Sequence, residues 1–278
     1  LRESDLIVVF GATWWPDEFT PDSAPVVQID RVPAQIGAGY PVLDGIAGDL
    51  RNVVPRLADA LRRAAAPDRS LWDRRVRTVC RSWGERIAEE AGKEGTPIPP
   101  QRVVKTISDL VADDAVIALD TGDHTLWFNR VFQAKRHDIL VSGRWRTIGF
   151  GLPAAIAAKL AQPERQAVAV VGDGGAVQTI MELTTAAEQQ LPVVVVVMNN
   201  GCYALEKHRM EAEGLNTLGS AVRPPDFAAL AQACGANGIA ADTPKRLEAA
   251  LRQALYERTR PTLIDVRTAP SVVPHTKL

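Results

Sequence analysis

Two short polar sequences stand at the ends of two apolar runs, and their residue types could hold a metal ion and a phosphate group. Gly172-Asp173-Gly174-Gly175 ends one run, and Asn199-Asn200 ends the next. A carboxylate and an amide oxygen suit Mg²⁺, which completes its coordination shell with water and phosphate oxygens. Glycines that open a helix let a phosphate approach the backbone amides there. The local sequence therefore predicts a magnesium-diphosphate site at Asp173 and Asn200.

These side chains can meet only if the elements that carry them lie side by side. Runs 167–171 and 193–198 are short and β-branched and lack polar alternation, which indicates buried parallel strands. A helical stretch at 181–188 lies between them, so the segment predicts one βαβ crossover. A right-handed crossover places the carboxyl ends of both strands at one edge of the sheet, where open α/β sheets bind ligands. We therefore expect Asp173 and Asn200 to be neighbours in space.

The same alternation of helices and strands extends from residue 101 to the end of the chain. The expected helices are 103–112, 150–160, 226–233 and 245–256, and the further strands are 115–119, 139–141, a short one at Ile239, and 262–266. This pattern predicts an α/β fold, a doubly wound and mostly parallel six-stranded sheet with helices on both faces.

The first hundred residues predict a partial second α/β domain. Strands are expected at 6–11 and 26–30 and a helix at 52–65, followed by a charged amphipathic helix at 71–91. The proline-rich stretch 95–100 is expected to be a non-helical linker. We divide the chain into a first domain at 1–66, a helix and linker at 67–100, and a larger domain at 101–278.

Composition narrows the class of protein. The chain has 278 residues, enough for one large or two moderate domains, and a net charge of −1, which gives no nucleic-acid footprint. No apolar run approaches the length of a bilayer-spanning helix. The three cysteines show no ligand spacing and argue for a reducing compartment. We expect a cytoplasmic protein with no nucleic-acid or membrane partner. Because the chain starts at Leu1 and soon enters a strand, we expect a fragment of a longer protein.

The ordered motif pair with its crossover resembles the thiamine diphosphate signature of the 2-oxoacid decarboxylase and carboligase superfamily. The segment 142–155, which begins Ser142-Gly143-Arg144-Trp145-Arg146, is similar to the one before the diphosphate strand in acetolactate synthases and pyruvate oxidases. Pro163-Glu164-Arg165-Gln166 followed by Gly172-Asp173-Gly174-Gly175 is especially like pyruvate oxidase. Residues 11–21, 28–30 and 48–49 resemble the second half of that family's central domain. The resemblance implies that the larger domain is the diphosphate-binding domain.

The resemblance also implies roles for particular residues. Asp173 and Asn200 match magnesium ligands through their side chains, and Cys202 matches a third ligand through its backbone carbonyl. The residues that match cofactor contacts are Gly172, Gly174 and Gly175 in the diphosphate turn, Gly122, Asp123 and His124 in a neighbouring strand-end loop, Ile148 as the apolar wedge behind the bent cofactor, and the backbone of Arg146 as an acceptor for its aminopyrimidine. His124 is equally well interpreted as a capping or packing residue.

Two charged segments near the expected site leave alternatives open. Arg144-Trp145-Arg146 stands where relatives often carry small residues. Its guanidinium groups could hold a substrate carboxylate, or they could be solvated or pair with a partner chain. The helix expected from Tyr203 carries Glu206 and His208, which are either acid/base candidates or part of a solvated face.

The function implied by the resemblance is decarboxylation of a small 2-oxoacid, with pyruvate as the default substrate, thiamine diphosphate and Mg²⁺ as cofactors and FAD as a further candidate. We expect no catalytic side chain here, because the family's cofactor-activating glutamate lies in a pyrimidine-binding domain of the same or another subunit. The chain alone is then expected to be inactive, and to form a homo-oligomer through helices 150–160 and 179–188.

Three rival functions remain. The first is a carboligase of the acetolactate synthase type without redox chemistry. The second is an inactive cofactor-binding module. The third is a dinucleotide-binding domain, against which the missing G-x-G-x-x-G after the first strand counts.

Overall fold

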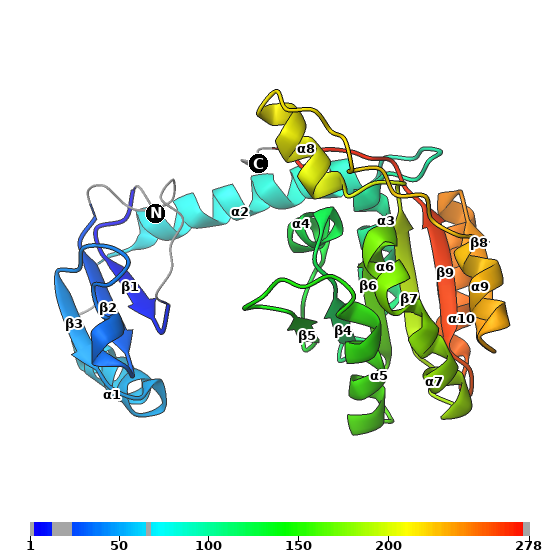
Figure 1. The fold of residues 1–278 in the computed structure, drawn as a ribbon. Helices are drawn as coiled ribbons and strands as arrows, with labels where there is room; N and C mark the ends of the chain where they lie inside the picture. Colours follow the sequence, from blue (N-terminus) through cyan, green and yellow to red (C-terminus); the bar gives the residue numbers. More distant parts are fainter. Residues whose placement is uncertain (1–2, 13–23, 65–67, 275–278) are drawn as a thin grey trace. The chain divides into compact units, whose positions relative to one another are not determined.

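The computed structural model describes residues 3–12, 24–64 and 68–274, which form two compact units, Leu1–Arg77 and Thr78–Leu278 (Figure 1). The unit boundary falls inside helix α2 (Ser70–Ala91), so the predicted helix-and-linker segment 67–100 is shared between the units. The predicted first-domain boundary at residue 66 lies outside the described residues. No helix in the described ranges is both long and apolar enough to cross a membrane.

The first unit contains a parallel three-stranded sheet and one helix. The strands are β1 (Ile7–Phe10), β2 (Val26–Asp30) and β3 (Asp44–Ala47), paired in that order, and helix α1 is Leu50–Arg63. A short 3₁₀ helix, η2 (Pro33–Gln35), lies between β2 and β3. Sequence analysis missed β3, because its four residues are all exposed and include Asp and Gly, which are depleted in strands. Asp49 caps α1 by accepting a hydrogen bond from the Arg51 amide at 2.9 Å.

The second unit is built on a six-stranded sheet with the strand order β5-β4-β6-β7-β9-β8. The strands are β4 (Val116–Leu119), β5 (Asp138–Val141), β6 (Ala167–Gly172), β7 (Val194–Asn199), β8 (Asn237–Ala241) and β9 (Thr262–Arg267). Every pairing in this sheet is parallel. The predicted six-stranded doubly wound fold is confirmed, with the two strands of the motif pair, β6 and β7, as direct neighbours.

The helices of the second unit largely follow the predicted ranges, with two corrections. They are α3 (Pro100–Leu110), α4 (Asp123–Val131), α5 (Gly151–Ala161), α6 (Asp173–Thr179), α7 (Leu183–Glu188), α8 (Ala204–Ala212), α9 (Phe227–Ala233) and α10 (Pro244–Tyr256). Pro100 was predicted to lie in a non-helical linker but is the first residue of α3, where its missing N–H costs nothing. The helical stretch predicted at 181–188 is present as α7 together with the end of the 3₁₀ turn η3 (Ile180–Glu182), but it is preceded by a separate helix, α6, which begins directly at Asp173.

Helices cover both faces of this sheet, because alternate strand residues point to opposite sides. Val168 and Val170 belong to a core cluster with residues of α3, α4 and α10. Ala169 and Val171 belong to a second cluster with residues of α5, α7 and α9. Both clusters are continuous across the central strands. Packing on both faces thus fixes the strands, and with them the positions of the strand ends at the carboxyl edge of the sheet.

Candidate functional site

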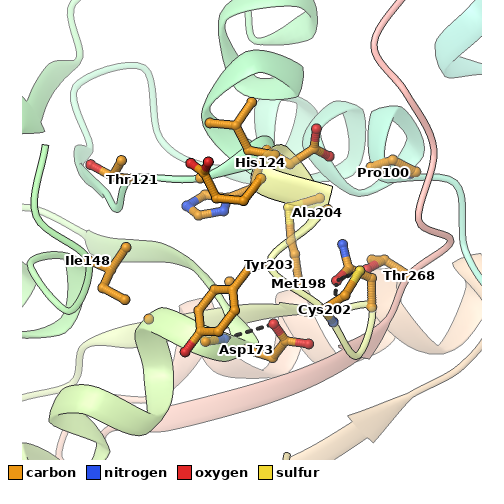
Figure 2. A pocket seen from close by; sticks show the side chains of 18 of the residues that line it. Pro100, Thr121, His124, Ile148, Asp173, Met198, Cys202, Tyr203, Ala204 and Thr268 are labelled. Atoms are coloured by element: carbon orange, nitrogen blue, oxygen red, sulfur yellow. Dashed lines mark hydrogen bonds between the residues drawn. The ribbon is translucent and has the colours of Figure 1, made fainter. Parts of the chain in front are cut away.

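A pocket lies where β4, β6 and β7 end and where α4, α6 and α8 begin (Figure 2). Every residue assigned from sequence to the cofactor or the metal lines it: Gly122, Asp123, His124, Arg146, Ile148, Gly172, Asp173, Gly174, Gly175, Asn200 and Cys202. Figure 2 shows His124, Ile148, Tyr203 and Asp173 gathered around this space. The expected meeting of Asp173 and Asn200 at one sheet edge is therefore confirmed as geometry, while their roles as ligands stay predictions.

Asp173 is a buried carboxylate held by backbone donors. Its side chain is at the start of α6, where Oδ1 accepts a hydrogen bond from the Gly174 amide at 2.7 Å and Oδ2 accepts one from the Gly201 amide at 2.6 Å. Burial raises the pKa of this carboxyl, and the backbone donors, among them Gly201 and Gly174, oppose that rise. A negative charge that is costly to bury suits a site for a cation.

The two adjacent asparagines have different partners. Asn199 is the last residue of β7, and its Nδ2 donates to Asp265 Oδ1 at 2.9 Å within the sheet. Asn200 lines the pocket, and its Oδ1 accepts from the Cys202 amide at 3.1 Å. Asn199 is thus a structural residue, and only Asn200 is placed to reach a ligand.

The oxygen atoms around Asp173 fit a hard cation better than a zinc-type ion. In the described part of the chain, no group of three or more His, Cys, Asp or Glu side chains could hold a metal. A carboxylate, an amide oxygen and a backbone carbonyl form a mixed oxygen set of the kind that Mg²⁺ accepts. Burial raises the pKa of the Cys202 thiol, so the sulfur stays protonated, which agrees with a ligand role for its carbonyl instead.

Glycine is required at two positions of the diphosphate turn for a reason that sequence analysis did not provide. A Cβ at Gly174 would collide with the Tyr203 ring, and a Cβ at Gly175 would collide with Asp120 Oδ2. Figure 2 shows the Tyr203 ring beside Asp173. These glycines therefore let Tyr203 and Asp120 pack against the start of α6, in addition to any approach of a phosphate.

His124 is a buried neutral imidazole that packs between two strand ends. Its ring lies against Gly122 and Gly172, where an added Cβ would contact the ring. Nε2 lies 3.0 Å from the Asp120 carbonyl oxygen, which can only accept, so Nε2 carries the proton. Burial lowers the pKa of this histidine, which leaves Nδ1 unprotonated. A contact from His124 to a diphosphate stays a prediction, and it would need a proton on Nδ1.

Asp120, which sequence analysis left without a role, fixes the loop before α5. Its Oδ2 accepts from the Gly149 amide at 2.9 Å and its Oδ1 from the Phe150 amide at 3.1 Å. The loop carries Ile148, which is 38% exposed, and Arg146, whose φ of +48° is rare for a residue with a Cβ. The role of Asp120 could have been suspected from the sequence, because it is a polar residue directly after the buried strand β4.

The segment Arg144-Trp145-Arg146 lies on the surface at the rim of the pocket, which Arg146 also lines. Trp145 is 89% exposed, and Arg144 and Arg146 are also exposed. Of the acid/base candidates, Glu206 lines the pocket, whereas His208 is buried outside its lining. Several further lining residues were not assigned from sequence, because their types are common in cores and loops: Pro100, Thr121, Met198, Tyr203, Ala204, Leu205 and Thr268.

Comparison with known proteins agrees with this fold and pocket. The family model described as "Thiamine pyrophosphate enzyme, C-terminal TPP binding domain" matches residues 120–266. That range starts at the carboxyl end of β4 and contains the whole of the motif pair. The chain belongs to this family, and its residues 120–266 form the thiamine pyrophosphate-binding domain of the thiamine pyrophosphate-dependent enzymes.

Individual relatives span several activities. YdaP of Bacillus subtilis, named as a thiamine pyrophosphate-containing protein, is 34% identical over 271 residues, covering 96% of this chain and 46% of the relative. An acetolactate synthase large subunit of Parasynechococcus marenigrum is 33% identical, covering 96% and 44%. A benzoylformate decarboxylase of Pseudomonas aeruginosa is 32% identical, covering 95% and 48%.

A solved structure is similar over the same extent. The thiamine diphosphate-dependent 4-hydroxybenzoylformate decarboxylase of Rhodococcus jostii RHA1 matches with a TM-score of 0.74 and 25% identity, covering 95% of this chain and 49% of that one. The chain thus spans about half the length of the proteins it matches.

Proposed function

We propose that this chain holds thiamine diphosphate and Mg²⁺ in the pocket at the sheet edge, as part of an enzyme that decarboxylates a 2-oxoacid such as pyruvate. The observation that carries the proposal is the convergence of Asp173 and Asn200 on one pocket, inside the range matched by the family model. The buried Asp173 carboxylate gives this pocket a negative centre that a divalent cation would neutralise.

In this proposal each part of the pocket wall has its own task. Asp173, Asn200 and the carbonyl of Cys202 hold Mg²⁺. The turns at 122–124 and 172–175 surround the diphosphate, while Ile148 and the backbone of Arg146 face the ring system. When bound, thiamine diphosphate supplies a carbon nucleophile and an electron sink for the loss of carbon dioxide. The chain's own residues bind and orient it, and the cofactor-activating glutamate belongs to a pyrimidine-binding partner domain.

Two other functions are compatible with the same pocket. The similarity to acetolactate synthase large subunits favours a carboligase that joins two 2-oxoacid-derived units without redox chemistry. An inactive cofactor-binding module would share the pocket but lack the partner domain. Product analysis of the full-length protein with pyruvate separates these functions. Acetolactate indicates the carboligase, acetate formed with an electron acceptor indicates a decarboxylating enzyme of the pyruvate oxidase type, and no product indicates the inactive module.

The cofactor site is tested by one substitution and a matched control. Asp173→Ala removes the charged metal ligand, and we expect it to abolish Mg²⁺-dependent binding of thiamine diphosphate to the full-length protein in calorimetry. Asp242→Ala is the control, because Asp242 also follows a strand of this sheet but is exposed and does not line the pocket. Unchanged affinity in Asp173→Ala would sink the proposal.

A further inference from the structure

A buried acidic side chain of the pocket wall, Asp123, faces a buried basic side chain, His208, which lies outside the pocket lining. Asp123 Oδ1 and His208 Nδ1 lie 3.8 Å apart, and the two side chains are 7% and 3% exposed. Among the described residues, neither atom has a hydrogen-bond partner. The distance is short enough for an ion pair, too long for a direct hydrogen bond and too short to hold an intervening water.

The rest of each side chain is already fixed. Asp123 Oδ2 accepts a hydrogen bond from Trp127 Nε1 at 3.0 Å within α4, which leaves Oδ1 directed elsewhere. His208 comes from α8, a separate helix beside α4 (Figure 1). An unpaired buried polar atom costs free energy, and a lone buried charge costs more. An interaction between Asp123 Oδ1 and His208 Nδ1 would therefore account for the burial of both atoms.

Helix α8 has few other attachments. Of its residues only Ala204 and His208 are buried. Its first turn nevertheless forms part of the pocket wall through Ala204, Leu205 and Glu206. A helix with so little buried surface belongs to the less stable parts of a fold, so one buried contact has a large share in holding it.

We propose that Asp123 and His208 form a buried positioning pair that fastens α8 to the start of α4. The pair thereby holds the α8 part of the pocket wall against the bound cofactor. Closure by less than 1 Å converts the 3.8 Å separation into a charge-assisted hydrogen bond. Only the effect on the cofactor rests on the proposed function, because the fastening of α8 does not need it.

The first test measures α8 itself, in the full-length protein without cofactor. His208→Leu replaces the imidazole with an apolar side chain of similar length, and we expect amide hydrogen exchange across 204–212 to become about tenfold faster. His208→Gln keeps an N–H donor and should retain most of the protection. Glu211→Gln is the matched control: it breaks the Lys207–Glu211 ion pair, which has the same 3.8 Å distance but is exposed, and it should change nothing.

The second test asks whether the two residues are coupled. His208→Leu leaves the Asp123 carboxylate buried without its partner, so adding Asp123→Asn should recover stability lost in the single variant, although α8 stays unfastened. Wild-type exchange rates in His208→Leu, or additive effects in the double variant, would overturn the proposal.

The third test measures cofactor binding by calorimetry. We expect His208→Leu to weaken binding of thiamine diphosphate with Mg²⁺ by about tenfold, without abolishing it. An unchanged affinity in a variant whose α8 exchanges faster overturns the link between the pair and the pocket. If the wild-type protein binds no cofactor, the proposed function fails, and the pair is still decided by hydrogen exchange alone.

Discussion

The Asp120 carboxylate accepts a hydrogen bond from the backbone amide of Gly149 at 2.9 Å, across a long stretch of sequence. Asp120 stands at the end of β4, and Gly149 ends the loop that carries Arg146 and Ile148 into the pocket. The same carboxylate excludes a side chain at Gly175. A single buried acid therefore joins three parts of the pocket.

The first prediction concerns this joint. Asp120→Ala removes the acceptors for the Gly149 and Phe150 amides, and each buried unsatisfied donor costs about 1–3 kcal/mol. We expect a fall in the free energy of unfolding of that order in urea titration, together with faster hydrogen exchange in 146–150. Ser142→Ala is the control, since the Ser142 hydroxyl accepts only a long 3.3 Å bond in the exposed part of the same loop. Equal stability of both variants would contradict the assignment.

The second prediction is a pH dependence at Asp123. Burial raises the pKa of its carboxyl to about 6, with His208 and the Trp127 hydrogen bond opposing the rise. Because the pKa of this carboxyl is raised in the folded state, its protonation stabilises the fold. That stabilisation is fully present below the ordinary pKa of 3.8 and is lost as pH rises through about 6. Asp123→Asn cannot ionise. We expect its stability relative to wild type to increase by on the order of 2 kcal/mol between pH 4 and pH 7. A constant difference across that range, measured by chemical denaturation, would contradict it.

The third prediction is a pH dependence of stability at Glu90, opposite in direction to that at Asp123. Arg130 donates to both carboxylate oxygens of Glu90 at 2.9 Å, and its guanidinium lies 4.7 Å from the Trp83 ring centroid. The Arg130 hydrogen bonds lower the pKa of Glu90. This stabilisation is present above the ordinary pKa of 4.5 and is lost as pH falls through the lowered value.

Glu90→Gln should therefore destabilise the protein by about 2–4 kcal/mol at pH 7 and by much less in acid, because it leaves a buried guanidinium unpaired. Glu248→Gln, which breaks an exposed pair with Arg252, is the control and should cost less than about 1 kcal/mol. Comparable losses in the two variants would show that Glu90 and Arg130 are not coupled in the way described.

The fourth prediction is the oligomeric state. Leu160, Val177 and Met181 on α5, α6 and η3 are large apolar residues with 57%, 39% and 59% exposure. Self-association would remove these apolar side chains from water, which favours an oligomer. We expect light scattering to give a mass above that of a monomer at micromolar concentration, and Met181→Glu to lower it. Leu218→Glu, at an exposed position outside these helices, should leave it unchanged. A monomer mass for the wild type would refute this expectation.

Sequence reasoning was strongest where burial determines both residue type and spacing. β6 is wholly apolar, and β7 is apolar up to its last residue, Asn199, because the sheet is covered on both faces. The ends of both strands, and hence Asp173 and Asn200, could therefore be placed beforehand. β3 was missed because none of its residues is buried. The break between α6 and α7 was missed because the sequence there contains neither Pro nor Gly to mark it.

Site residues that act through the backbone or through tertiary contact were the hardest to predict. Asp120 bonds amides of a distant loop, and Tyr203 packs on Gly174 from another strand end. Neither partner is near in the chain, so no local pattern could reveal them. The Asp123–His208 pair is of the same kind, because its two residues belong to helices that are far apart in sequence.

The different partners of Asn199 and Asn200 determine which changes of length β7 can tolerate. A deletion or insertion of one residue within β7 would leave an asparagine at only one of the two positions, so either the bond to Asp265 or the side chain in the pocket would be lost. Such a slip would also turn the valines of one core cluster towards the other. Point substitutions can be absorbed locally, but a change of one residue in the length of β7 cannot, because it shifts the register with both neighbouring strands. Length variation in this domain should therefore collect in surface turns such as 214–219, beyond the strand ends.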